Sequence, residues 1–133
     1  MLASNDYYAL GNITLREAVV ISMDSKSVIE KFQRTGVLYQ SMACIKCTRA
    51  MYIGKYKNLD GYIWRCLQCK TKTSIRKDSY FERHKIEIGK LFLMIICFLK
   101  YDKIPAVYLS ELCEISEESL VMWGCHVRES ISH

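Results

Sequence analysis

The spacing of hydrophobic residues changes twice along the chain, from a helical period to a strand period and back again. Residues 13–23 place apolar side chains every three or four positions, and Thr14 with Glu17 forms a capping box at their start. A second helix is expected to follow directly and to end at Gly36. Its expected buried residues are Val28, Ile29 and Phe32. The two helices together predict an N-terminal helical lid over residues 1–41.

The middle of the chain follows a period of two, which is typical of strands. Tyr52, Gly54 and Tyr56 alternate with Met51, Ile53 and Lys55, residues 62–66 follow the same period, and Asp60-Gly61 between them is a hairpin signal. A third strand is expected over residues 71–76. So small an antiparallel sheet buries too little area to be stable alone, which indicates that a metal is needed. The aromatic side chains expected to form its core, rather than to stack on bases, are Tyr62 and Trp64.

A helical period returns near the C-terminus. Residues 88–101 are apolar on nearly every side and predict a central helix. Pro105 suits the first turn of the next helix, and Ser116 is a good N-cap for a last one. Two short helices joined by a tight turn and packed on a longer one predict a helix-turn-helix-like unit over residues 84–133. The residues expected on the buried faces of the two short helices are Ala106, Leu109, Leu112, Leu120, Trp123, Gly124, Val127 and Ile131.

Two Cys-x-x-Cys pairs, separated by eighteen residues, flank the predicted hairpin. This spacing lets four thiolates close a tetrahedron around one Zn²⁺. Two disulfides or four incidental thiols are the alternative, which the absence of an export signal disfavours. A closed Cys₄ site is typically structural, because it leaves no position for a substrate. The expected zinc ligands are Cys44, Cys47, Cys66 and Cys69. The fold class predicted is therefore α+β, with a three-stranded zinc ribbon over residues 42–83.

The remaining cysteines and histidines are weaker candidates for a functional site. Cys97 lies in an apolar stretch and is expected to be a small buried residue. Cys113, Cys125 and His126 could form a second metal site, but their spacing matches no standard zinc template. His84 is expected to be an exposed bystander, with a phosphate contact as the alternative.

Charge is distributed unevenly. The net charge of +5 divides into zero for residues 1–43, +8 for residues 44–90 and −3 for residues 91–133. Concentrated positive charge is typical of proteins that bind a polyanion, most often nucleic acid, although a merely solvated surface is the alternative. The side chains expected to contact phosphate are Lys55, Lys57, Lys70, Lys72, Arg76 and Lys77. Such contacts provide affinity but little sequence discrimination.

The chain carries no obvious targeting or membrane signal. Its start lacks a basic segment before an apolar run, so no signal peptide is evident. The longest apolar run, residues 91–99, is nine residues long, whereas a membrane span needs about twenty. We expect an intracellular protein that is not secreted, nuclear if its source is eukaryotic, with no membrane partner and no small-molecule substrate.

The run GYIWRCLQCKTKTSIRKDSYFERHKI resembles the region that leaves the zinc ribbon in Merlin-type transposases and their ISXO-type insertion-sequence relatives. The positions that match the family motif SIRKGSFFE are Ser74, Ile75, Arg76, Lys77, Ser79, Phe81 and Glu82. Asp78 stands where the family has glycine, and Asp tolerates the left-handed backbone better than most residues. The flanking segments GVLYQSMACIKC and LCEISEESLVMWGCHVRE are similar to the regions before and after, so the resemblance spans residues 14–131.

The resemblance implies an N-terminal DNA-recognition region followed by an RNase H-like domain whose acidic residues bind divalent metal and cut DNA. The sequence ends at His133, and such a domain would need on the order of 100 further residues. We therefore expect a truncated, transposase-derived protein without enzymatic activity, with DNA as its partner and a further protein or full-length transposase as a second one. The alternatives are a zinc-stabilised protein-interaction module and a non-functional transposon remnant.

The predicted recognition helix has an unfavourable charge for DNA. Glu117 and Glu118 lie at its start, where they stabilise the helix dipole but repel phosphate. We therefore expect the lysines and arginine of the ribbon to supply most of the affinity for DNA.

Overall fold

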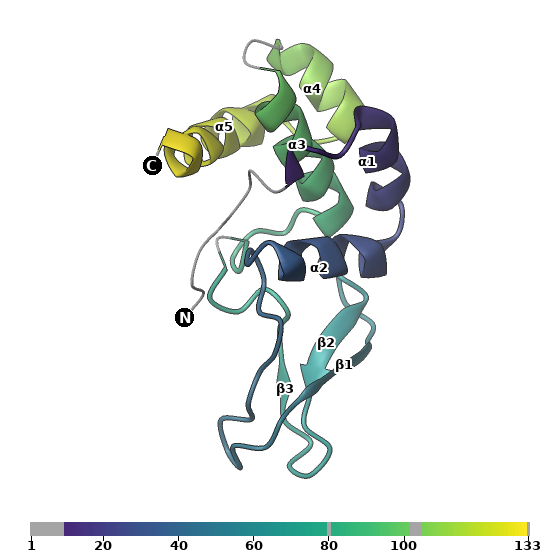
Figure 1. Ribbon diagram of the computed structural model, residues 1–133, viewed down its shortest axis with the longest axis vertical. Helices are drawn as coiled ribbons and strands as arrows, with labels where there is room; N and C mark the ends of the chain where they lie inside the picture. Colours follow the sequence, from purple (N-terminus) through teal and green to yellow (C-terminus); the bar gives the residue numbers. More distant parts are fainter. Residues whose placement is uncertain (1–9, 80, 102–104, 133) are drawn as a thin grey trace.

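The computed structural model describes residues 10–79, 81–101 and 105–132, with side chains described as far as residue 124. This part of the chain contains five helices and one three-stranded antiparallel sheet, which confirms the predicted α+β class. The helices gather at one end of an elongated molecule and the sheet with its loops projects from the other (Figure 1). None of the described helices is both long and apolar enough to cross a membrane.

The two N-terminal helices, α1 (Leu15–Ser22) and α2 (Ser25–Arg34), lie where the apolar spacing predicts them. The Thr14 hydroxyl accepts a hydrogen bond from the Glu17 N–H at 3.2 Å, and the Glu17 carboxylate accepts one from that hydroxyl at 2.9 Å. The second helix ends before Gly36, which adopts a positive φ of 79°. Its buried residues are the three predicted, Val28, Ile29 and Phe32.

Helix α3 (Ile88–Lys100) is the centre of the helical end. Its buried side chains run from Ile88 through Cys97, and the other four helices all contact it. Gly89 is the point of closest approach, because a Cβ atom at this position would overlap the carbonyl oxygen of Ser22 at the end of α1. The N-terminal lid is therefore packed directly on α3 and shares one hydrophobic core with it.

The last two helices, α4 (Ala106–Cys113) and α5 (Glu117–Ser132), follow α3 and pack on it and on each other. Glu114 turns the chain between them with a left-handed φ of 57°. The Ser116 hydroxyl accepts the N–H of Ser119 at 3.3 Å, which confirms Ser116 as the N-cap of α5.

Burial on these two helices agrees with the prediction at most of the described positions. Leu109, Leu120 and Trp123 are buried, as is Gly124, whereas Ala106 is only partly covered. Leu112 corrects the prediction, since it is 41% exposed. The buried face of α4 instead passes through Leu109 and Cys113, four positions apart. The side chains predicted as buried at positions 127 and 131 lie outside the described part of α5.

The sheet consists of β1 (Tyr52–Lys55), β2 (Tyr62–Arg65) and β3 (Lys72–Thr73), hydrogen-bonded in that order. The connection between β1 and β2 is a six-residue loop over 56–61, longer than the tight turn that Asp-Gly suggests. The third strand is shorter than predicted because the chain turns at residue 74. Trp64 and Met51 are buried, whereas Tyr62 is only half-buried, so the ribbon core is as small as expected.

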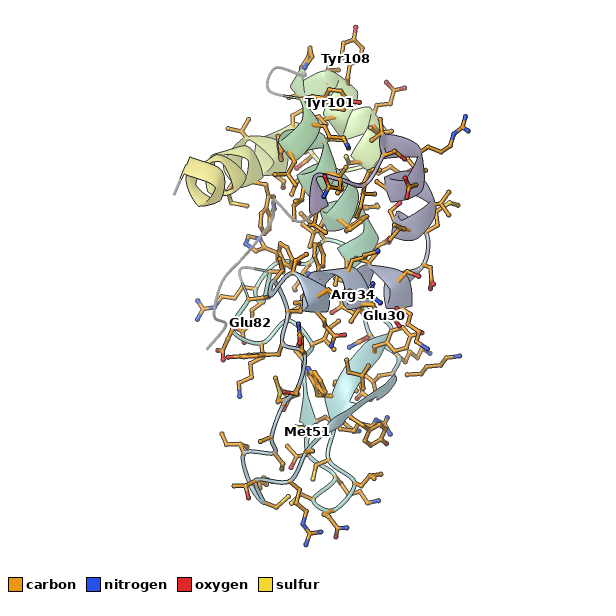
Figure 2. All side chains as sticks on the ribbon, viewed as in Figure 1. Glu30, Arg34, Met51, Glu82, Tyr101 and Tyr108 are labelled. Carbon is orange, nitrogen blue, oxygen red and sulfur yellow. The ribbon has the colours of Figure 1, made fainter. Side chains whose placement is uncertain are left out.

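Aromatic residues join the ribbon (residues 42–83) to the helices. The Phe81 ring lies 5.3 Å from the Phe32 ring and 5.3 Å from the Trp123 ring, measured between centroids. Phe81 itself is fully buried. Figure 2 shows the two ends of the molecule, with Met51 on the ribbon and Tyr108 at the helical end. The hydrophobic core is thus continuous from the helices into the upper ribbon.

Candidate metal centre and its basic surface

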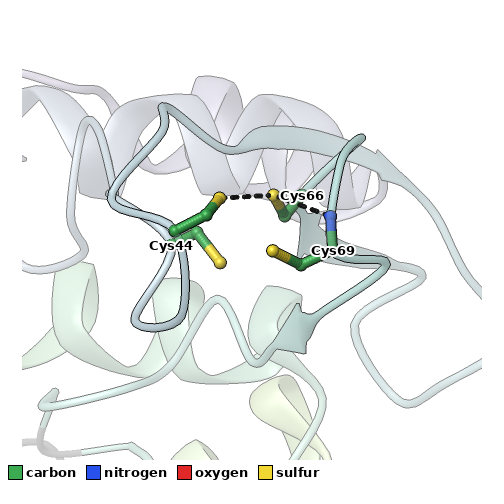
Figure 3. A group of neighbouring side chains, drawn as sticks. Cys44, Cys66 and Cys69 are labelled. Atoms are coloured by element: carbon green, nitrogen blue, oxygen red, sulfur yellow. Dashed lines mark hydrogen bonds between the residues drawn. The ribbon is translucent and has the colours of Figure 1, made fainter.

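Four cysteines converge at the end of the ribbon that is farthest from the helices. Cys44 and Cys47 come from the loop before β1, and Cys66 and Cys69 from the loop after β2 (Figure 3). Their sulfur atoms all lie within 4.8 Å of one another, and the Sγ atoms of Cys47 and Cys66 are 3.5 Å apart. A tetrahedral centre with metal–sulfur bonds of about 2.3 Å needs sulfur atoms about 3.8 Å apart. The four thiols are therefore positioned to bind a metal ion.

The two cysteine loops, which we call the knuckles (residues 44–48 and 66–70), repeat one backbone geometry. The Thr48 N–H donates to the Cys44 carbonyl at 2.8 Å, and the Lys70 N–H donates to the Cys66 carbonyl at 3.0 Å. Thr48 and Lys70 both have a left-handed φ of 62°. A β-branched residue in this conformation is strained, so the first knuckle is held in place against a local cost.

Backbone N–H groups prepare one thiol for metal. Hydrogen bonds from the N–H groups of Cys47 and Lys46 lower the pKa of Cys44 to about 6, against the opposing effect of burial. The hydrogen bond with the Cys47 sulfur, together with burial, raises the pKa of Cys69 to about 12. This arrangement favours the thiolate form of Cys44 and the protonated form of Cys69. Thiols must lose their protons to bind a metal.

The six cysteines whose side chains are described are all free thiols. Cys97 is buried in α3, as predicted. It hydrogen-bonds with Cys113, which lowers the pKa of Cys97 and raises that of Cys113. The side chains of Cys125 and His126 lie outside the described residues, so the hypothesis of a second metal site there stays untested. Among described residues, the group that could hold a metal is the set of four knuckle cysteines.

Most of the predicted phosphate-binding residues lie on the ribbon surface. Lys77 is half-buried, and the exposed ones are Lys55, Lys57, Lys70 and Lys72. None of these five lysines forms an ion pair with a described residue. Their charges therefore remain available to an external anion.

Arg76 is the exception, and its place in the structure corrects the prediction that it contacts phosphate. It is only 3% exposed, and its guanidinium donates to the Asp60 carboxylate at 2.6 Å and 3.0 Å. The same guanidinium also donates to the carbonyl oxygens of His84 at 3.0 Å and Ile86 at 2.7 Å. Burial is tolerated because these acceptors satisfy the cation. Arg76 thus ties the hairpin loop to the segment that leads into α3.

Asp78, next in the same motif, adopts the backbone expected of it. Its φ is 63°, the left-handed conformation that glycine favours. The Tyr39 hydroxyl donates to its carboxylate at 3.0 Å, and the pKa of Tyr39 is raised by burial and by this carboxylate. An aspartate at this position therefore preserves the loop.

The sequence prediction missed Arg65, which belongs to the same basic surface. Its guanidinium carbon lies 5.5 Å from the centroid of the Tyr56 ring, and the Lys72 ammonium lies 5.0 Å from it. Both distances fall within the range of cation–π attraction. The signal was the strand period: Arg65 alternates with buried Trp64 and so points to the opposite face.

His84 is not the exposed bystander that the sequence suggests. Its side chain is half-buried, and its ring centroid lies 4.6 Å from that of Trp123. The contact places His84 at the base of the helical unit rather than on the basic surface.

The described side chains of α4 and α5 carry the opposite charge. Residues 105–124 contain no lysine or arginine. The acidic side chains exposed there are Glu111, Glu114, Glu117 and Glu118. Glu117 and Glu118 occupy the first turn of α5, as expected from the sequence.

Comparison of the chain with protein-family models, with curated proteins and with solved structures gives no match in any of the three. The resemblance to Merlin-type transposases therefore stays a prediction that rests on the motif residues themselves. Support for the fold class and for the cysteine cluster comes from the structure and not from these comparisons.

Proposed function

We propose that this chain is a transposase-derived DNA-binding protein in which the ribbon holds one structural Zn²⁺ and contacts the phosphate backbone. The proposal includes no catalytic role. It rests on the family motif, on the cysteine cluster and on the charge of the ribbon surface, of which the last carries the most weight.

Zinc is the metal that the donor set favours. Four thiolates in a tetrahedron suit Zn²⁺ or iron, and the paired Cys-x-x-Cys spacing is typical of structural zinc. With all four thiols deprotonated, the centre would carry a formal charge of about −2, which nearby cations would partly balance.

The observation that carries DNA binding is an excess of unpaired cations on the ribbon. Residues 44–73 contain seven lysines and arginines but a single carboxylate, that of Asp60. That carboxylate is buried against Arg76 and is not available to the others. Even after the metal centre is balanced, several positive charges remain without a partner. Such a surface is suited to the closely spaced phosphates of a DNA backbone.

The acidic surface of α4 and α5 argues against these helices as the main DNA contact. Exposed carboxylates at the start of α5 would face the phosphates in the usual docking of a recognition helix. We therefore place the main contact on the ribbon, with little sequence discrimination from it.

A salt titration with matched variants tests this function. Binding of zinc-loaded protein to a fluorescent 20-base-pair duplex is followed by anisotropy, and the log–log slope should fall by about 0.9 for each phosphate contact removed. The ribbon variant K55Q/K57Q/K70Q/K72Q should lose most affinity. The control R16Q/K26Q/K31Q/R34Q removes the same charge from the N-terminal helices and should retain it. Absence of binding by the parent protein at low salt would refute the proposal.

A protein-interaction module is the second candidate, and one observation favours it. The outer surfaces of α4 and α5 expose large apolar side chains next to the carboxylates, namely Val107, Tyr108, Leu112, Val121 and Met122. A partner that co-purifies after nuclease treatment and is lost in Val121→Glu would support this function. A partner that is lost on nuclease treatment would instead indicate bridging by nucleic acid.

A further inference from the structure

The outer face of the ribbon contains a small hollow beside the second knuckle. Its volume is about 80 Å³, and its lining residues are Tyr52, Arg65, Cys66, Leu67, Lys70 and Lys72. One water needs about 10–15 Å³ of such volume, so the hollow has room for a small group such as phosphate. Three of its lining side chains are cationic and none is acidic.

Strand register builds this arrangement. Tyr52 on β1 pairs with Arg65 on β2, which in turn pairs with Lys72 on β3. Directly paired residues of neighbouring strands share one face of the sheet. One aromatic ring and two cations therefore form a row across all three strands, on the face opposite buried Trp64.

The cations of this row are held in place without a carboxylate partner among the described residues. Arg65 and Lys72 both lie over the Tyr56 ring, and neither forms an ion pair with a described residue. The Nε atom of Arg65 is buried and has no hydrogen-bond partner within the described chain. A carboxylate would fix these side chains but cancel their charge, whereas an aromatic ring fixes them and leaves the charge to attract an anion.

Tyr52 supplies an exposed ring next to the hollow. A Cβ atom at Gly54 would lie 3.2 Å from the ring carbon Cε2 of Tyr52, so the ring rests on the backbone of its own strand. Tyr52 remains 42% exposed, whereas Trp64 is 4% exposed. On this face of the ribbon, solvent therefore reaches a tyrosine ring, whereas Trp64 is buried on the opposite face.

We propose that this face binds one unpaired nucleotide, with its phosphate between Arg65, Lys70 and Lys72 and its base stacked on Tyr52. The inference rests on the proposed nucleic-acid function and goes beyond it, because it names single-stranded nucleic acid as the preferred ligand of this face. A base inside a duplex has both of its faces covered, whereas an unpaired base can stack on an exposed ring. Cations beside an aromatic ring are the usual composition of single-strand sites.

The first test compares a fluorescent twelve-nucleotide thymidine strand with a twelve-base-pair duplex, using the full zinc-loaded chain. Tyr52→Ala should weaken binding of the single strand about 5- to 140-fold and leave duplex binding within about twofold. Tyr52→Phe should bind like the parent, because stacking needs only the ring. Tyr108→Ala, at the far end of the molecule, is the matched control. Circular dichroism and zinc content confirm that each variant is folded.

The second test separates the phosphate site from a role in balancing the metal centre, since Cys66 also lines the hollow. Arg65→Gln and Lys72→Gln should weaken both nucleic acids about tenfold at unchanged zinc content. If these variants lose zinc but bind nucleic acid with unchanged affinity once saturated with zinc, the two cations only balance the charge of the metal centre. Inorganic phosphate at millimolar concentration should compete weakly. If inorganic phosphate competed as strongly as the oligonucleotide, the hollow would be a site for free phosphate and the proposed nucleotide site would be refuted.

The outcomes also distinguish this inference from the proposed function. If the duplex binds and the lysine variant weakens it, but Tyr52→Ala leaves the single strand unaffected, the nucleotide site is refuted and the DNA-binding function stands. If neither nucleic acid binds, both fail. Photocrosslinking of a 5-iodouracil strand should map to Tyr52, and exclusive crosslinking elsewhere would refute the site.

Discussion

The two ends of the ribbon are held by different means. At the far end, the knuckles expose Ile45 at 78% and Leu67 at 68%, and the four thiols are what brings the loops together. At the helical end, Phe81 is fully buried, and Arg76 is locked into Asp60 and backbone carbonyls. The comparison teaches that a three-stranded sheet can rely on packing only as far as the helical core extends. Beyond that point lie the four cysteines that are positioned to bind a metal, and we propose that the bound metal replaces the missing core.

Metal removal should produce the largest difference between the two ends. Chelation, or Cys66→Ser, should unfold the knuckles and sheet, because structural zinc contributes on the order of 10 kcal/mol or more in small zinc domains. The two tryptophans report on each end separately, since Trp64 and Trp123 are both buried. In Trp123→Phe, where Trp64 remains, emission should shift to the red on chelation. In Trp64→Phe it should barely change, and an equal shift in both would show that the ends are not independent.

Breaking the buried ion pair should have the next largest effect, at the opposite end. Asp60→Ala leaves the Arg76 cation buried without its carboxylate, and we expect a loss of about 3–5 kcal/mol in unfolding free energy. The control is Glu114→Gln, which breaks the exposed pair with Lys90 at 3.5 Å and should cost less than about 1 kcal/mol. Urea denaturation followed by circular dichroism measures both. Equal costs would contradict the structural role of Asp60.

A glycine pair probes packing within the helical end alone. Gly89→Ala forces a methyl group into the Ser22 carbonyl, so α1 must shift, at a cost of about 1–3 kcal/mol. Gly124→Ala is the matched change, since its new Cβ would lie 3.4 Å from the Phe98 ring and needs only a small adjustment. Thermal unfolding should separate the two variants. A neutral Gly89→Ala would mean that α1 is free to move away from α3.

Relief of backbone strain in the first knuckle should have the smallest effect. Thr48→Gly removes a β-branched side chain from φ of 62°, which is worth about 1–2 kcal/mol before the greater freedom of glycine in the unfolded chain is subtracted. We expect zinc affinity to rise by no more than about tenfold. Thr48→Ala also loses the hydroxyl that bonds to the Cys47 carbonyl at 2.6 Å, but it keeps the strain and should not gain affinity. Competition with a chelating dye measures both variants.

Local signals in the sequence were sufficient for much of this fold. Thr14 and Ser116 predict helix starts, because each depends on neighbours a few residues away. Cysteine spacing predicts the metal cluster across a longer stretch, because the repeated Cys-x-x-Cys pair is itself a recognised zinc pattern. The pairing of Asp60 with Arg76, sixteen positions apart, could not be predicted, since no such pattern marks the two residues and only the tertiary fold joins them. Asp60 looked like a turn residue and Arg76 like a surface cation.

The same limit explains two further wrong or missing predictions, at Leu112 and Arg65. Leu112 was assigned to the buried face of α4, but in a helix of eight residues the apolar positions fit more than one face. Arg65 was overlooked because it stands between two core positions, and only the strand register shows which face it occupies. Both outcomes depend on neighbours that the local pattern does not specify.

The ion pair of Asp60 and Arg76 also constrains how a chain of this kind can diverge. A substitution at only one of the two positions leaves an uncompensated buried charge. We therefore expect the two positions either to change together or to stay unchanged. Exposed lysines such as Lys57 face no such barrier and can drift to arginine or glutamine singly. Among homologues, joint variation at positions 60 and 76 would therefore indicate that the fold is shared, even where the residues of the binding surface differ.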